Sequence, residues 1–326
     1  MQLNKIITML SRRYLRTKTL QALFEYEIGK SVTPAVGEKN LFTSIRNLKS
    51  LSLIHFEIIL YLKKLALERI ENVKTKFLPS DEDLNPNLKF VQNSIFQILE
   101  NNTDYQEQIK NSKIDVSPEI DIIRQTFQNL INSEEYKAYM NSETSDFEED
   151  RNFIMDVFKD FVVNNDALSS AYAEKNLHWY SDFFEAALLT AKSIKGLTPD
   201  YPIDQELPAF ISNEDDDADD IVFVKTLYHS VIKNKDKYME IIINRLENWD
   251  SDRLAVLDLI ILKMALAEFI ECPSVPIKVT INEYIELSKD YSTPKSKIFI
   301  NGLLDKISIE LLSKNIIQKT GRGLLT

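Results

Sequence analysis

Apolar residues recur every three or four positions along most of this chain, the spacing that places them on one face of a helix. The pattern is clearest between residues 249 and 307, where three consecutive helices can be placed. The first of them carries an apolar face formed by Leu254, Leu257, Ile261 and Met264. The third carries a longer stripe made of Ile300, Leu303, Leu304, Ile307 and Leu311. The pattern therefore predicts a helical bundle at this end of the chain.

Residues with known end preferences indicate where these three helices begin and end. Pro273 and Pro276 should end the first helix, because proline cannot continue one. Thr280 and Glu283 have the spacing of a capping box, which predicts that the second helix starts at about residue 281. Thr293–Pro294 pairs a capping residue with a proline, which predicts the start of the third helix.

Helical periodicity also fills the rest of the chain. Residues 10–28 form one amphipathic segment, for which Ser11 is the expected N-cap. Further helical segments are expected at 42–77, 88–99, 120–140, 146–163 and 177–194, separated by polar or proline-containing connections, and a pair of them at 221–248, joined near residues 234–236. No internal repeat is present. The prediction is an all-α protein.

Composition supports this fold class and excludes several functions. The 326 residues include only 6 glycines, and the glycine-rich loops of nucleotide-binding sheets are missing. Cys272 is the single cysteine, so no disulfide can form within the chain. No signal peptide opens the sequence and no apolar run would span a bilayer, so we expect a cytoplasmic protein.

Charge is distributed unevenly. The net charge of −11 argues against nucleic-acid binding by the chain as a whole. However, residues 1–30 carry six basic residues against two acids, and residues 313–326 carry three basic residues and no acid. The acids gather in the middle, above all in the run 214–220, where six of seven residues are acidic. This run is expected to be a solvated flank of the following helix, since it lacks the spacing of a metal site.

Three arginines open the first helix. Arg12, Arg13 and Arg16 fall within a sector of roughly 100° on its first turns. Two hypotheses fit this cluster: a solvated helix start, or a patch that contacts phosphate groups.

A second candidate corner lies at the start of the third C-terminal helix. Lys295 and Lys297 occupy its first turn, and Phe299 shares a face with Lys295. Cations beside an aromatic ring at a helix N-terminus suit a single RNA strand, although a core-edge phenylalanine with solvated lysines is the plainer interpretation. Asn301–Gly302 then interrupts good helix formers, which predicts the close approach of a neighbouring helix.

Residues that could carry covalent chemistry are scattered. His55, His178 and His229 show no ligand spacing, and Cys272 has no histidine near it in sequence. Neither a catalytic constellation nor a metal or cofactor site is predicted.

The C-terminal motifs resemble those of the NusB family of transcription antitermination factors. They are the run I-L-x-x-A-L-x-E ending at Glu268, V-P-I-K-V-T-I-N-E-Y-I-E-L-S-K at 275–289, and F-I-N-G-L-L-D-K-I at 299–307. R-R-x-x-R at 12–16 followed by L-Q-A-L-F-x-x-E at 20–27 is similar to the arginine-rich start of the same family.

The resemblance implies a non-catalytic protein. It would bind the single-stranded boxA sequence of nascent ribosomal RNA together with the ribosomal protein NusE, and would keep the transcribing RNA polymerase complex moving through terminators. The RNA contacts it implies are Arg12, Arg13, Arg16, Lys295, Lys297 and Phe299.

The family pattern is interrupted. The expected organisation is a first core helix with a basic N-terminus at 1–30, a helical insertion at 31–205, and a NusB-like C-terminal bundle at 206–326. Two other functions stay open: a protein-interaction scaffold that uses the acidic insertion, and an RNA-binding subunit of an RNA-modifying enzyme.

Overall fold

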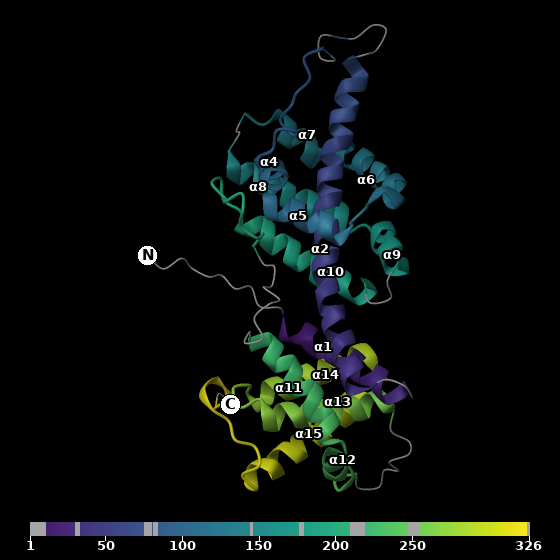
Figure 1. The fold of residues 1–326 in the computed structure, drawn as a ribbon, viewed down its shortest axis with the longest axis vertical. Helices are drawn as coiled ribbons and strands as arrows, with labels where there is room; N and C mark the ends of the chain where they lie inside the picture. Colours follow the sequence, from purple (N-terminus) through teal and green to yellow (C-terminus); the bar gives the residue numbers. More distant parts are fainter. Residues whose placement is uncertain are drawn as a thin grey trace. The chain divides into compact units, whose positions relative to one another are not determined.

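The chain folds into helices only. The computed structural model describes residues 11–29, 33–74, 80, 84–143, 146–175, 179–208, 219–246 and 255–324. Every regular element within these ranges is helical, which confirms the all-α prediction (Figure 1). They divide between two compact units: Arg46–Ile211 form unit 1, and Leu10–Ile45 with Ser212–Thr326 form unit 2.

The limits of unit 1 differ from the expected insertion at 31–205. The reason is α2 (Pro34–Lys74), one continuous helix of 41 residues, which starts within unit 2 and continues into unit 1. A helix has no turn residues at such a division, so the local sequence gives no signal of it.

Unit 1 consists of most of α2 and the helices that follow it. These are α4 (Ser94–Asn101), α5 (Thr103–Ser112), the 3₁₀ turn η1 (Ser117–Glu119), α6 (Ile120–Asn132), α7 (Glu134–Asn141), α8 (Phe147–Val157), the π-helical turn η2 (Phe158–Val163), α9 (Asp166–Lys175) and α10 (Trp179–Gly196). Buried polar contacts join α2 to α10: the Ser52 and Thr190 hydroxyls lie 2.7 Å apart, and Nδ1 of the fully buried His55 lies 3.2 Å from the Thr190 hydroxyl.

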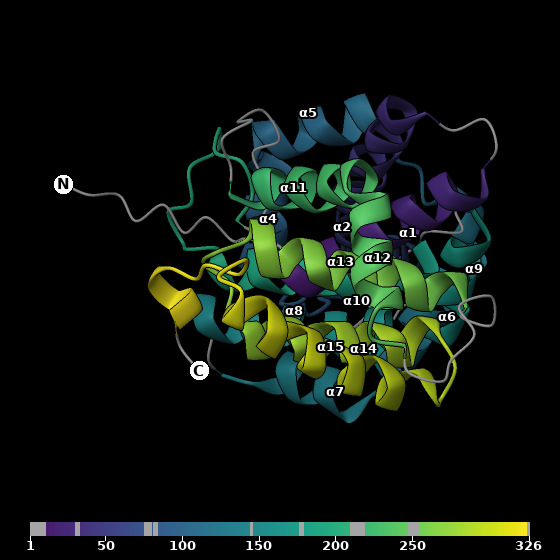
Figure 2. The same cartoon turned by 90° about the horizontal axis from the view of Figure 1, so that it is seen from below.

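Unit 2 is built around one helix that is buried on nearly all sides. Its elements are α1 (Arg12–Ile28), the start of α2, α11 (Asp219–Lys233), α12 (Lys235–Ile243), α13 (Val256–Glu271), α14 (Ile277–Tyr291), α15 (Ser296–Ser313) and the 3₁₀ turn η4 (Gly321–Leu324). α13 packs against α1, α11, α12, α14 and α15. Figure 2 shows α13 between α11 and α15. The enclosure explains why every residue from Ile260 to Phe269 is buried.

Helix ends in unit 2 follow some of the predicted signals. The Ser11 hydroxyl caps α1 by accepting a hydrogen bond from the Tyr14 amide at 3.1 Å. α13 ends at Glu271, just before Pro273, and α15 starts at Ser296, two residues after Pro294. Leu254 of the predicted apolar face and residues 214–218 of the acidic run lie outside the described residues.

Two of the local predictions are wrong. α14 starts at Ile277, with Pro276 as its N-cap, so Thr280 and Glu283 lie inside the helix and do not form a capping box. Their side chains instead reach other helices, as described below. Among the residues that the structure describes, no helix approaches Gly302 closely either: a Cβ atom added there would meet nothing within 4 Å.

Candidate nucleic-acid interface

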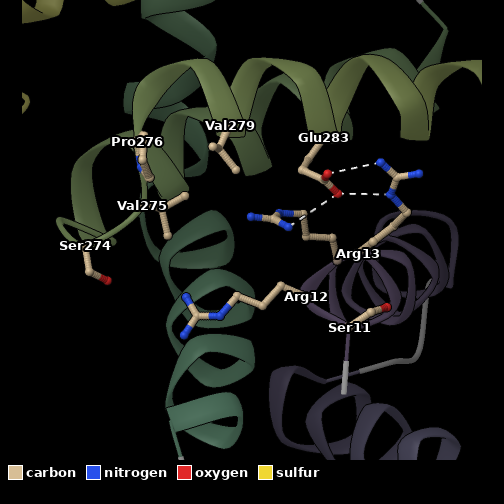
Figure 3. A pocket seen from close by; sticks show the side chains of 9 residues that line it. Ser11, Arg12, Arg13, Ser274, Val275, Pro276, Val279 and Glu283 are labelled. Atoms are coloured by element: carbon tan, nitrogen blue, oxygen red, sulfur yellow. Dashed lines mark hydrogen bonds and ion pairs between the residues drawn. The ribbon is translucent and has the colours of Figure 1, made fainter. Parts of the chain in front are cut away.

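The N-terminus of α1, the segment joining α13 to α14, and α14 itself line a pocket of about 500 Å³ in unit 2. α1 supplies the charged groups of the arginines, the joining segment supplies apolar groups, and α14 supplies Val279 and the carboxylate of Glu283 (Figure 3). The lining residues are Ser11, Arg12, Arg13, Arg16, Ser274, Val275, Pro276, Val279 and Glu283.

Arg16 is the buried member of the arginine cluster. Its side chain is 3% exposed and donates two hydrogen bonds to Glu268, from Nε at 2.8 Å and from Nη2 at 2.7 Å. Burial opposes its charge, but the hydrogen bonds and charge of Glu268 outweigh that effect and raise the pKa of Arg16 above the ordinary arginine value. Arg16 therefore stays charged inside the unit.

The Glu268 carboxylate is completely buried and joins three helices. Besides Arg16 of α1, it accepts hydrogen bonds from the hydroxyls of Thr280, at 2.8 Å, and Tyr284, at 3.1 Å, both on α14. Four donors on one buried carboxylate meet the condition under which an internal ion pair is tolerated. The guanidinium of Arg16 has little surface left for a ligand, and its observed contacts hold α1 on α13 and α14.

Arg13 is the exposed member of the cluster. Its guanidinium pairs with Glu283 of α14 through Nε and Nη2, both at 3.1 Å, while 52% of the side chain stays accessible. The hydrogen bond to Glu283 is the main reason that the pKa of Arg13 is raised. Arg16 also lies 3.6 Å from this carboxylate, which therefore draws both arginines toward α14. A phosphate group that binds Arg13 must compete with Glu283.

Arg12 lies on the opposite side of the pocket. It extends toward α11, away from Glu283 (Figure 3), and its guanidinium carbon lies 4.8 Å from the centre of the Phe223 ring. Arg16 contacts the same ring from 5.3 Å. Stacking on an aromatic ring fixes the plane of a guanidinium and leaves its edge available for hydrogen bonds.

An apolar wall completes the pocket. Val275, Pro276 and Val279 stand opposite α1 (Figure 3), and Val279 is 42% exposed. Arginine guanidinium groups beside a small apolar surface can hold a phosphate and a base of one nucleotide together.

The second predicted corner lies at the start of α15. Lys295 and Lys297 are exposed and Phe299 is half-buried. The start of α15 is fixed by the buried carboxylate of Asp258 on α13, which accepts hydrogen bonds from Ser292 at 2.5 Å and Ser296 at 2.8 Å.

A single carboxylate relates the two corners. The pKa of Glu286 on α14 is lowered mainly by a hydrogen bond from Lys289, and the charges of Arg13 and Lys297 add to the effect. The charges of Arg13 and Lys297 thus both favour the ionised form of Glu286.

The C-terminal tail supports the segment that carries the apolar wall, a contact that sequence reasoning missed. The ammonium group of Lys319 donates to the carbonyls of Cys272, at 3.0 Å, and Glu268, at 3.4 Å. Gly323 lies against Pro273 so closely that an added Cβ atom would stand 2.0 Å from the Pro273 carbonyl oxygen. The only sequence features associated with this contact are the basic residues and glycines of the C-terminal tail.

Cys272 does not resemble a nucleophile. Its side chain is buried, and burial followed by the nearby charge of Glu268 raises the pKa of its thiol to about 12. No group of three or more acidic, histidine or cysteine side chains in the described part of the chain could hold a metal ion. None of the helices placed by the structure has the length and apolar character needed to cross a bilayer.

Comparison with known proteins identifies the family. The model of the NusB family matches residues 186–308. A transcription antitermination protein NusB of Salinibacter ruber is 38% identical over 111 residues, which cover 34% of this chain and 69% of that protein. The chain belongs to the NusB family. The NusB protein of Clostridium botulinum is 40% identical over 106 residues, or 80% of its length, and that of Chloroherpeton thalassium is 41% identical over 103 residues, or 49% of its length.

The family match covers only part of the candidate interface. Lys295, Lys297, Phe299 and the apolar wall lie inside residues 186–308, whereas the arginines of α1 lie outside them. The match also starts within α10 of unit 1, so the family segment does not coincide with unit 2.

Proposed function

We propose that this NusB-family chain is a transcription antitermination factor. In this proposal it binds the boxA sequence of nascent ribosomal RNA together with ribosomal protein NusE, and the assembly keeps the transcribing RNA polymerase complex from terminating. The chain contributes binding and scaffolding and no covalent chemistry. Its curated relatives carry the name transcription antitermination protein NusB.

The observation that supports an RNA site in unit 2 is the pocket at the start of α1. Two arginines line it: Arg13 pairs with Glu283 while 52% of its side chain stays accessible, and Arg12 is stacked on Phe223. Beside them, Val279 offers an accessible apolar surface. We assign the phosphate contacts to Arg12 and Arg13, with Lys295 and Lys297 extending the path and Phe299 contacting a base.

The test is fluorescence anisotropy with a boxA-containing RNA and a scrambled RNA, each with and without NusE and at several salt concentrations. The informative variant is Arg12→Gln/Arg13→Gln, because a glutamate beside Glu283 would add repulsion unrelated to RNA. Arg124→Gln/Lys137→Gln is the matched control, since it removes two exposed cations from unit 1. We expect wild type to prefer boxA and NusE to strengthen that preference.

The salt dependence locates the contacts. Each phosphate contact on a single strand contributes about 0.7 to the slope of log affinity against log salt, so Arg12→Gln/Arg13→Gln should reduce the slope by about 1.4. The unit 1 control should keep the wild-type slope. Equal affinity for boxA and scrambled RNA in the presence of NusE would refute the proposed function, and equal losses in both double variants would refute the site.

A further inference from the structure

The chain beyond α15 turns back toward the end of α13. Asn315, two residues after α15, has a left-handed backbone with a φ of 54°, a conformation that asparagine adopts more readily than most residues. The Ile316 amide then donates a hydrogen bond to the Leu311 carbonyl at 2.9 Å, which closes the helix. Ile317 is buried and fixes the first part of the C-terminal tail, residues 314–324. The local structure at the end of α15 therefore directs the tail to α13.

Lys319 of the tail binds the backbone at the C-terminus of α13. Its side chain is half-buried, and its ammonium group donates hydrogen bonds to the Cys272 carbonyl at 3.0 Å and to the Glu268 carbonyl at 3.4 Å. The last carbonyls of a helix lack partners within it and form the negative end of its dipole, so a cation is favourable there. Lys319 thus joins the tail to the last turn of α13.

The backbone of the tail contacts the next residue along, Pro273. The Thr320 amide donates a hydrogen bond to the Pro273 carbonyl at 3.0 Å. Gly323 lies against the same carbonyl, and a Cβ atom added there would stand 2.0 Å from its oxygen. Only glycine permits so close an approach of two backbones. A lysine side chain and a glycine backbone of the tail therefore meet on two neighbouring residues of the segment that joins α13 to α14.

The apolar wall of the pocket begins immediately after this contact. Val275 and Pro276 follow Pro273 in sequence and line the pocket, and Pro276 is the N-cap of α14. The joining segment has few donors of its own, because its two prolines lack an N–H group. Its Val275 amide donates to the Cys272 carbonyl at 3.1 Å, the same carbonyl that accepts from Lys319. The tail thus supports the wall from outside the pocket.

We propose that the C-terminal tail is a positioning element of the RNA pocket, with Lys319 and Gly323 as its positioning residues. The tail holds Pro273, and Pro273 sets the place of the apolar wall opposite Arg12 and Arg13. This role rests on the proposed RNA-binding function, to which it adds the element that controls base discrimination. Phosphate groups bind the arginines of α1, whereas a base packs on the wall. Loosening the tail should therefore reduce discrimination between RNA sequences and leave the phosphate contacts intact.

Direct binding of phosphate by the basic tail is the competing explanation. The geometry disfavours it, because the ammonium group of Lys319 is directed at backbone carbonyls. In the described part of the chain, the residues that line the pocket also include none from the tail. The two explanations differ in salt dependence. A direct contact would contribute about 0.7 to the slope of log affinity against log salt, whereas a positioning role leaves the slope unchanged.

The test compares two ways of loosening the tail with a matched control. Lys319→Met removes the ammonium group but keeps most of the side chain, and Gly323→Ala places a methyl group against the Pro273 carbonyl. Lys314→Met is the control, since it removes another cation of the tail, one that pairs with Glu310 of α15. Fluorescence anisotropy in the presence of NusE measures the affinity of each variant for boxA and scrambled RNA across a salt series.

Both loosened variants should bind boxA RNA less selectively. We expect each to lose at least about fivefold of the preference for boxA over scrambled RNA, the lower end of what one base contact contributes. Their salt slopes should equal the wild-type slope. Lys314→Met should keep both the preference and the slope. Lys319→Arg should keep the preference, because it retains a charged donor.

Hydrogen exchange shows whether the effect is local. The Val275 amide should exchange faster in both loosened variants, while the amides of the buried part of α13 keep wild-type protection. Unchanged Val275 exchange, an unchanged boxA preference, or a salt slope lowered by about 0.7 in Lys319→Met would each overturn the proposed role of the tail. Lost protection throughout α13 would also overturn it, because the variants would then act by general destabilisation. A wild type without boxA preference would refute the proposed function and this role with it, and that outcome is recognised without any variant.

Discussion

The buried carboxylate of Glu268 offers the sharpest test of how unit 2 is held together. Glu268→Gln keeps the size of the side chain, so it creates no cavity, but it removes the negative charge that faces Arg16 at 2.7 Å. Arg16 remains charged because a guanidinium is not deprotonated in proteins, and its side chain has only 3% exposure through which to reach water. The substitution therefore leaves a buried, uncompensated cation.

The expected loss is large. Breaking a buried ion pair by removing one partner costs about 3–5 kcal/mol. Thr280 donates to one carboxylate oxygen of Glu268 and Tyr284 to the other, and glutamine keeps only one of these acceptors, so one of the two hydroxyls also loses its partner. Because whole domains are stable by about 5–15 kcal/mol, Glu268→Gln should leave unit 2 marginally stable.

Hydrogen exchange followed by mass spectrometry is the suitable assay, since a single melting curve would mix two units. Amides of α13 report on unit 2, and amides of α6 in unit 1 serve as the internal control. Arg16→Met/Glu268→Gln should recover at least half of the loss, because it also removes the stranded cation. A loss below about 1 kcal/mol in Glu268→Gln, or a double variant as unstable as the sum of both single changes, would refute the reasoning.

Two further predictions concern other parts of the chain. His55 in unit 1 is fully buried, and burial lowers its pKa from 6.5 to about 3. Between these two pKa values the unfolded state binds more protons than the folded state, so the unfolding free energy of unit 1 should fall by up to about 1.4 kcal/mol per pH unit from pH 6.5 downwards. His55→Gln should flatten this pH dependence between pH 6.5 and 5, measured by hydrogen exchange of α6. An unchanged slope in the variant would contradict the prediction. The second change, Gly323→Ala, would make the new Cβ atom clash with the Pro273 carbonyl and should detach the C-terminal tail. The Thr320 amide donates a hydrogen bond to that carbonyl at 3.0 Å, so its hydrogen exchange should become faster while α6 stays protected. Unchanged protection of the Thr320 amide would contradict the prediction.

Local sequence signals predicted the helical class and several helix ends. Ser11 caps α1, and the prolines after α13 end that helix, because these effects depend only on nearby residues. The same local reasoning gave a wrong capping box for Thr280 and Glu283. Their spacing fits a cap, but their hydroxyl and carboxylate bind Glu268 and Arg13, which are partners from other helices.

The candidate site was predictable only in part, for a similar reason. The sequence brought three arginines together at the start of one helix but gave no sign that Arg16 would be buried. Its partner lies 252 residues away, beyond the reach of any local pattern. The contact of Lys319 with the Cys272 carbonyl could not be predicted for the same reason, since it joins the C-terminal tail to a residue that is distant in sequence.

The distance in sequence between Arg16 and Glu268 also imposes an order on folding during synthesis. Unit 1 is dominated by the continuous segment Arg46–Ile211, which leaves the ribosome before any part of α13 exists. At about 5–20 residues per second, Glu268 follows Arg16 by roughly 13–50 s. Throughout that time the arginines of α1 lack the carboxylates of α13 and α14, while the segment of unit 1 can already fold. α1, which is synthesised long before α13 and α14, thus reaches its final contacts only after they have been made.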